Sequence, residues 1–135
     1  MTALPPVTDV IPHREPFIFV SSVSACDAQA ATGHHTFDTE GFFAGHFPNM
    51  PIVPGVILIE GLAQTLAYLA LRQVPDGNVM LTGVDGCKLR ASVHPGDTVT
   101  YQVDVTRSKL RMVIAKGTVT VGDTHILSAT LKGYI

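Results

Sequence analysis

The chain has 135 residues, 46% of them hydrophobic and 15% charged, and a formal net charge of −2. A chain of this length can form one respectable core, so we expect a single domain over residues 1–135. The slightly acidic balance argues against a nucleic-acid-binding protein. The small share of charged residues indicates that another subunit covers much of the surface.

Cysteine usage and hydropathy indicate where such a protein works. The two cysteines, Cys26 and Cys87, stand at no metal-ligand spacing and indicate no disulfide scaffold. Residues 1–14 lack the basic start and the apolar stretch of a signal peptide. The most hydrophobic segment is too short to span a membrane and is interrupted by Glu60 and Gln64. These features predict a protein of the reducing cytoplasm that has no membrane partner.

The expected elements follow one another closely along the chain. Residues 1–15 are rich in proline, and two segments with the composition of β-strands follow, at 17–25 and 28–37. The loop from Asp38 to Pro54 contains too many glycines and prolines for a helix. A helix then precedes four further strands, which we expect at 79–85, 97–106, 112–121 and 125–135. Short connections favour antiparallel pairing, so the sequence predicts an α+β fold in which an antiparallel sheet wraps around one helix.

The expected helix runs from Val56 to Leu71. Leu, Ile, Val and Ala occupy nearly every face of it, so we expect it to be buried on all sides. A buried carboxylate such as Glu60 is costly and must find a partner or take up a proton. Gln64 and Tyr68 follow on the same helix face. We expect Gln64 to orient the site by a hydrogen bond, and Tyr68 to be packed with its hydroxyl satisfied.

A histidine and a helix N-terminus lie just upstream of Glu60. His46 stands in a loop rich in glycine and proline, and Gly55 opens the helix. The first helical residues, Gly55 and Val56, offer unpaired N–H groups and the positive end of the helix dipole. Gly55 has no side chain, so a substrate can approach its backbone closely. An acid near a histidine and a helix N-terminus is an arrangement suited to proton transfer.

Three motifs carry a family resemblance. Residues 45–64, GHFPNMPIVPGVILIEGLAQ, resemble the signature of FabZ-type β-hydroxyacyl-acyl-carrier-protein dehydratases, a hotdog-fold family. Residues 11–20, IPHREPFIFV, resemble the family's opening motif, and residues 83–97, GVDGCKLRASVHPGD, a later motif more loosely. The resemblance implies the hotdog fold and dehydration of 3-hydroxyacyl thioesters on acyl carrier protein to trans-2-enoyl thioesters. The pathway would be fatty-acid synthesis or a related polyketide or polyene pathway.

The resemblance also assigns residues and partners. His46 and Glu60 fall on the family's two catalytic positions, and Gly55 on its thioester-binding amide. We expect three further residues to bind substrate, namely Val56, Phe47 and Gln64. The resemblance implies no cofactor and no metal. It implies a homodimer, or a trimer of dimers, in which His46 and Glu60 of one site come from different chains.

The chemistry of dehydration agrees with these roles. The reaction removes a weakly acidic α-proton and expels hydroxide as water, so it requires a base, an acid and a donor for the enolate oxygen. His46 suits the base, because imidazole titrates near physiological pH. Desolvation favours the protonated form of Glu60, which can then donate to the leaving hydroxyl. The amides of Gly55 and Val56 suit the third role.

The remaining histidines do not predict a metal site. His34 and His35 are adjacent on an expected strand, so their side chains point to opposite faces and cannot both reach one ion. We expect three others to be ordinary surface or loop histidines, namely His13, His94 and His125. His13 carries slightly more weight, because it lies in the opening motif.

The basic residues are unevenly distributed. Only Arg14 precedes residue 68, whereas eight lysines and arginines follow it. Because carrier proteins are acidic, we expect the carrier to dock on the C-terminal half. The basic residues concerned are Lys88, Arg90, Arg107, Lys109 and Arg111.

Several positions depart from the family pattern. Glu15 replaces an apolar or aromatic residue, Ser21-Ser22 a common Asp-Arg pair, and Leu89 and Ala91-Ser92 an aromatic residue and Arg-Pro. These departures leave the expected catalytic pair unchanged. They indicate a specialised relative that serves a secondary pathway.

Two other functions remain open. A hotdog acyl thioesterase would hydrolyse the thioester with a helix carboxylate and water, and would not need His46. A non-catalytic partner subunit that binds acyl chains would need neither His46 nor Glu60. The product formed from a 3-hydroxyacyl thioester distinguishes the three: an enoyl thioester, a free thiol or neither.

Overall fold

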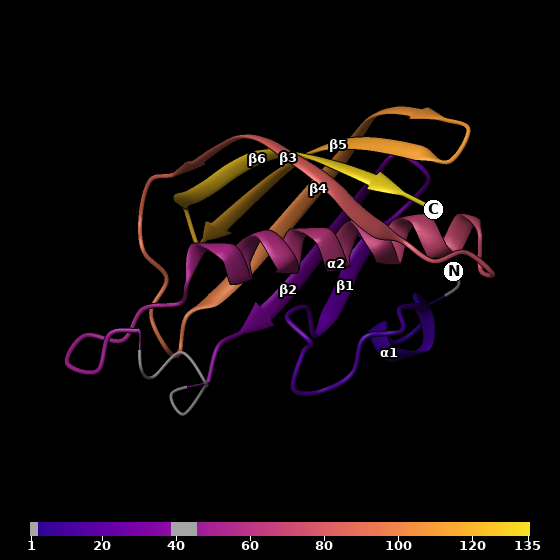
Figure 1. Cartoon of the computed structure of the whole chain (residues 1–135). Coiled ribbons are helices and arrows are strands. Elements are labelled where there is room, and N and C mark those ends of the chain that lie inside the picture. The colour runs from indigo at the N-terminus through magenta and orange to yellow at the C-terminus, as the bar shows by residue number, and fades with distance from the viewer. Residues whose placement is uncertain (1–2, 39–45) are drawn as a thin grey trace.

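A six-stranded antiparallel sheet lies along one long helix (Figure 1). The computed structural model describes residues 3–38 and 46–135. The strands pair in the order β1-β2-β4-β5-β6-β3, so β1 and β3 form the two edges. The elements are α1 (Val7–Val10), β1 (Ser22–Cys26), β2 (Ala30–Thr36), α2 (Gly55–Gln73), β3 (Met80–Leu89), β4 (Thr98–Lys109), β5 (Met112–Val121) and β6 (Thr124–Tyr134). The predicted antiparallel sheet around one helix is confirmed.

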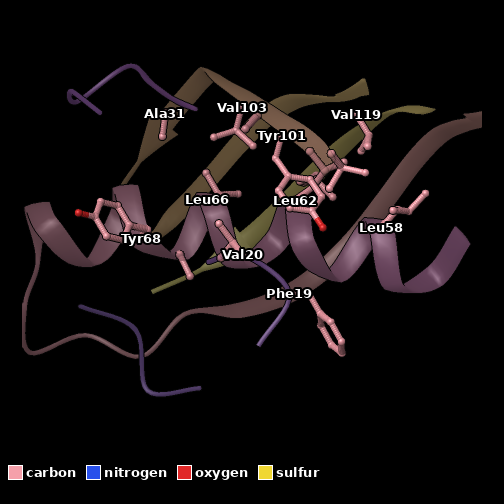
Figure 2. Close-up of a cluster of buried hydrophobic side chains, with 14 of the residues drawn as sticks. Phe19, Val20, Ala31, Leu58, Leu62, Leu66, Tyr68, Tyr101, Val103 and Val119 are labelled. Carbon is pink, nitrogen blue, oxygen red and sulfur yellow. The ribbon is translucent and has the colours of Figure 1, made fainter. Parts of the chain in front are cut away.

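The core fills the space between α2 and the sheet. Leu58, Leu62 and Leu66 of the helix are buried there. Tyr101 and Val103 of β4 face the helix from the sheet and are fully buried (Figure 2). Burial of each such side chain contributes about 1.5–3 kcal/mol to folding. This packing fixes α2, and with it Glu60 and Gln64, against the sheet.

The first expected strand begins later than predicted. The segment 17–25 was expected to be a strand throughout, but β1 starts at Ser22. Phe19 lies on the side of α2 away from the sheet (Figure 2). Gln64 Nε2 donates to the carbonyl oxygen of Phe17 at 3.1 Å, and Gln64 Oε1 accepts from the amide of Phe19 at 2.8 Å. The side chain of Gln64 therefore occupies backbone groups of Phe17 and Phe19 that would pair with a neighbouring strand if β1 began earlier.

Burial of α2 differs between its two halves. From Gln64 to Leu71 every side chain is buried, as predicted. The first turns are more exposed, and Val56 is 70% exposed. The expectation of burial on all sides is therefore wrong for the N-terminal turns of α2. The expectation that this segment is too short to span a membrane is wrong, since the helix is long and apolar enough by length and composition alone. However, 61% of that stretch is buried against the rest of the chain.

The packing of Gly61 predicts an unusual response to mutation. Alanine normally stabilises a helix interior relative to glycine by about 1 kcal/mol. A Cβ at Gly61, however, would overlap the ring and hydroxyl of Tyr101, which is fully buried and cannot swing away. We therefore expect Gly61→Ala to destabilise the protein by about 1 kcal/mol or more, because overpacking outweighs helix propensity. The melting temperature should fall by about 3 °C or more.

Gly55→Ala is the matched control in the same helix. Its added Cβ would meet only Leu89 Cδ2, at an ordinary 3.4 Å. This variant should melt within about 2 °C of the parent protein. A Gly61→Ala protein that melts higher than the parent would contradict the close approach of Tyr101 to the helix.

Candidate active site

Glu60 lies in the second turn of α2 at the edge of the core. Its side chain is 24% exposed. Gln64 Nε2 donates to Glu60 Oε2 at 3.1 Å, one helical turn away. His13 Nε2 lies 3.7 Å from the same oxygen. Among the residues that the structure describes, no hydrogen bond or ion pair involves Glu60 Oε1. Glu60 is therefore held by one oxygen, and the other is open to a ligand.

Gln64 fixes the position of this carboxyl group. Its side chain is fully buried, and its oxygen and nitrogen are bonded to the backbone of Phe19 and Phe17. The same nitrogen bonds Glu60. The amide thus joins the N-terminal segment, the helix and the carboxyl group in one network. The hydrogen bond from Gln64 to Glu60 is present, and the role of Gln64 in orienting a site stays a prediction.

A small cavity lies beside Glu60. It has a volume of about 80 Å³ and is lined by His13, Glu60 and apolar residues of α2, together with Val79 and Leu81 next to the sheet edge. The volume is enough for a few water molecules. Glu60 therefore has access to water without full exposure.

The N-terminus of α2 offers free backbone donors. Pro54 is the N-cap and makes no side-chain capping bond. Within the described residues no acceptor is found for the amides of Gly55 and Val56. Unpaired N–H groups at a helix N-terminus attract anions and carbonyl oxygens. Leu89 borders this point, since its Cδ2 would lie 3.4 Å from a Cβ at Gly55.

The loop before α2 holds His46. His46 Nδ1 lies 3.4 Å from the carbonyl oxygen of Ile52, whose amide in turn donates to the carbonyl of His46 at 2.9 Å. Phe47 stacks on the imidazole, with ring centroids 4.5 Å apart, and is itself exposed. If Nδ1–H donates to Ile52, then Nε2 carries the free lone pair. The loop therefore presents an imidazole with one nitrogen able to accept a proton.

The structure divides the predicted site residues into two groups. Glu60 and Gln64 are hydrogen-bonded to each other, whereas His46 and Phe47 lie in the loop before Gly55 and Val56. No hydrogen bond or ion pair joins His46 to Glu60 in the part of the chain that the structure describes. The cavity beside Glu60 is lined by His13 and not by His46. One chain alone therefore shows no paired His46 and Glu60.

His13 is the site neighbour that the sequence did not reveal. An ordinary surface histidine was expected, but its side chain is only 25% exposed and its Nδ1 is buried without a partner among residues 3–38 and 46–135. The expectation is wrong because the turn after α1 folds back over α2. The one available signal was its place in the opening motif.

Other predicted side chains have structural roles. Tyr68 donates its hydroxyl to the carbonyl of Pro5 at 2.6 Å, which confirms that it is packed and satisfied. Burial raises the pKa of its phenol. His34 bonds Ser24 and Thr100, and His35 bonds Ser21. In the described parts of the chain, no three histidine, cysteine or acidic residues are placed to hold a metal ion.

The five basic residues expected to bind the carrier form two groups. The β3-end pair, Lys88 and Arg90, lies where Leu89 pairs with Leu127 of β6. The hairpin group, Arg107, Lys109 and Arg111, surrounds the β4–β5 turn, next to the pairing of Met112 with Tyr134. Leu127 and Tyr134 stand about 20 Å apart along β6. In one chain, the two groups therefore lie at opposite ends of the sheet.

The sheet wrapped around one helix is the hotdog fold. A chain of the dehydratase heterocomplex ApeI:P from Xenorhabdus doucetiae has this fold, with a TM-score of 0.82 and 17% sequence identity. That match covers 98% of this chain and 91% of the other. At this identity the match shows the fold alone.

Sequence comparison identifies the family. A model of the FabA-like domain matches residues 11–130. The chain is 36% identical over 117 residues to the 3-hydroxyacyl-[acyl-carrier-protein] dehydratase FabZ of Petrotoga mobilis, covering 85% of this chain and 84% of the relative. It is 34% identical over 137 residues to the FabZ of Campylobacter jejuni, covering 96% and 94%. The chain therefore belongs to the FabA-like family, as a FabZ-type hotdog dehydratase, which is a hydro-lyase.

Proposed function

We propose that this enzyme dehydrates 3-hydroxyacyl thioesters on acyl carrier protein to trans-2-enoyl thioesters in the cytoplasm, with His46 as the base and Glu60 as the acid. The observation that carries the proposal is the environment of Glu60 on α2. One carboxyl oxygen is held by Gln64 and the other is open, one and a half turns from a helix N-terminus with free amides. Its FabZ relatives are named for this reaction.

Each step of the proposed reaction can be assigned to a residue. The carbonyl oxygen of the thioester accepts hydrogen bonds from the amides of Gly55 and Val56, which stabilise the enolate. His46 Nε2 removes a proton from C2, and the electron pair of that C–H bond forms the C2=C3 double bond. The C3–O bond breaks, and Glu60 gives its proton to the departing hydroxyl, so that water leaves. Proton transfer from His46 to Glu60 through water then restores both residues.

We propose a homodimer in which each site takes His46 from one chain and Glu60 from the other. The edge strand β3 leaves Met80, Leu81 and Leu89 exposed. Exposed apolar edge strands pair readily with another strand. Val56, at the exposed end of α2, provides more apolar surface for a partner. Two copies related by a two-fold axis would cover both surfaces.

Antiparallel pairing of two β3 edges would also bring the β3-end pair of one chain close to the hairpin group of the other. The Leu89 end of one β3 would lie beside the Met80 end of the other. Met80 pairs with Tyr134, which pairs with Met112 next to the hairpin group. The β3-end pair of one chain would then lie near the hairpin group of its partner. We propose that an acidic carrier protein docks across both, near the helix N-terminus.

We propose that this enzyme is a specialised relative, a proposal that its departures from the family pattern support. Leu89 borders Gly55, where the thioester would bind. The family's usual aromatic residue at this position would narrow the entrance more than leucine does. We therefore propose an acyl substrate of a polyketide or polyene type as an alternative to the simple fatty-acyl chain.

The first prediction concerns the catalytic pair. His46→Ala and Glu60→Gln should each slow dehydration by about 100-fold or more, because each group moves one proton. A 3-hydroxyacyl thioester should be supplied, and the enoyl product and free thiol measured separately. His125→Ala, an exposed position on β6, is the matched control and should keep full activity. A folded variant with nearly full activity would remove that residue from the mechanism, and release of thiol by the parent enzyme would establish a thioesterase.

The second prediction concerns carrier docking. Charge reversal within the β3-end pair or within the hairpin group should reduce kcat/KM for carrier-bound substrate by about tenfold or more. Turnover of a small pantetheine thioester should change little, because that substrate does not contact these residues. Added salt should weaken only the carrier-bound reaction, since ions screen exposed charges.

Lys116→Glu reverses an exposed charge in the middle of β5 and serves as the control. It should leave both substrates unaffected. Equal losses on carrier and pantetheine substrates would argue that the basic groups are only a solvated surface.

The third prediction concerns the shared site. Mixing inactive His46→Ala with inactive Glu60→Gln makes heterodimers with one doubly altered site and one intact site. Random reassortment should restore about a quarter of all sites. Activity should return only after joint refolding or coexpression, because the subunits must exchange.

The control mixture pairs His46→Ala with the double variant His46→Ala/Glu60→Gln. It forms the same mixed dimers without an intact site, so it should stay inactive. If verified mixed dimers of the single variants also stay inactive, then both residues of a site come from one chain.

A further inference from the structure

His13 is placed against the catalytic acid by a rigid turn. The guanidinium of Arg14 donates to the carbonyl oxygens of Ile11 and His13 at 2.9 and 2.7 Å. The amide of Phe17 donates to the carbonyl of Arg14 at 2.8 Å, and Ile11 is buried in the core. The imidazole stacks with the ring of Phe17 at 6.5 Å. These contacts fix the position of His13 on its own element, independently of Glu60.

Two nitrogens converge on one oxygen of Glu60. Gln64 Nε2 lies 3.1 Å and His13 Nε2 lies 3.7 Å from Oε2. The amide nitrogen is always a donor. The distance from His13 is slightly longer than a hydrogen bond, as is common for catalytic groups before substrate binds.

The second nitrogen of His13 indicates its tautomer. Nδ1 is buried and has no partner in the described residues. A proton on Nδ1 would be a buried N–H without an acceptor, whereas a proton on Nε2 faces the carboxyl oxygen of Glu60. Its Nε2–H then points at Glu60 Oε2.

We propose that His13 is a positioning residue that, together with Gln64, fixes the reactive proton of Glu60 on Oε1. Gln64 Nε2–H donates to one lone pair of Oε2, and the Nε2–H of His13 faces the same oxygen from 3.7 Å, so a proton on Oε2 would face two donors. The proton therefore sits on Oε1, the oxygen that no described residue binds. After the proton has gone to the leaving hydroxyl, both donors stabilise the carboxylate that remains. This inference rests on the proposed function of Glu60 as the acid.

The test variant, His13→Phe, removes the N–H donor of His13 but keeps an aromatic ring at this position. His13→Phe should retain the stacking on Phe17 and lower kcat for a 3-hydroxyacyl pantetheine thioester by about tenfold or more. KM should change less than about twofold, because His13 lies behind Glu60 and not on the substrate. His13→Gln, whose amide can again donate from the Nε2 position, should recover most of the lost rate. His125→Gln is the control for a histidine elsewhere and should match the parent enzyme.

A double-mutant cycle separates positioning from a structural role. On a Glu60→Gln background, His13→Phe should cause no further loss of rate, because no acidic proton remains to be positioned. Independent, multiplicative losses would overturn the proposal, as would a His13→Gln variant that is as slow as His13→Phe.

An infrared measurement tests the contact without relying on activity. The carbonyl stretch of protonated Glu60 is the band that disappears in Glu60→Gln. Loss of a donor to Oε2 should move it to higher wavenumber in His13→Phe, and His13→Gln should move it back. An unchanged band would overturn the inference even in an active enzyme. If the parent enzyme does not dehydrate the substrate but the band still shifts in His13→Phe, then the proposed reaction is refuted while the contact between His13 and Glu60 is supported.

Discussion

The site depends on one buried amide, that of Gln64. It is the only buried side chain in the described residues that joins the N-terminal segment to α2 through both its oxygen and its nitrogen. The same nitrogen reaches Glu60. Loss of the bond to the buried amide of Phe19 would cost about 0.5–1.5 kcal/mol. A single residue thus stabilises the fold and holds the carboxyl group of Glu60, so a change in this residue alters both together.

A second constraint is that one chain leaves its helix incompletely covered. The C-terminal half of α2 is enclosed by the sheet and by the segment before β1, whereas Val56 in the first turn is 70% exposed. The groups to which we assign the chemistry lie at this end of the helix: the amides of the helix N-terminus, the His46 loop and Oε1 of Glu60. A partner subunit that covered this surface would also exclude water from the reaction, which strengthens each electrostatic interaction there.

The fold and the polar stripe of α2 could be predicted because both repeat with a fixed period. Alternation along β4 and β5 and the spacing of Glu60, Gln64 and Tyr68 each depend on neighbours within one element. The start of β1 could not be predicted, because apolar residues 17–20 have the composition of a strand, while the backbone of Phe17 and Phe19 is bonded to a side chain distant in sequence. The contact of His13 with Glu60 was missed for the same reason. The contact joins two residues that are far apart in the sequence, and a local sequence pattern cannot predict such a contact.

The central claim is that Glu60 acts through Oε1 on a substrate whose thioester lies at the helix N-terminus. The most direct test is a crystal structure with a 3-hydroxyacyl pantetheine analogue in which an amide replaces the thioester. The account predicts the 3-hydroxyl within hydrogen-bond distance of Glu60 Oε1, the amide oxygen on the N–H groups of Gly55 and Val56, and the partner subunit's His46 facing C2. A hydroxyl bound to Oε2, or a ligand that does not touch Glu60, would contradict it.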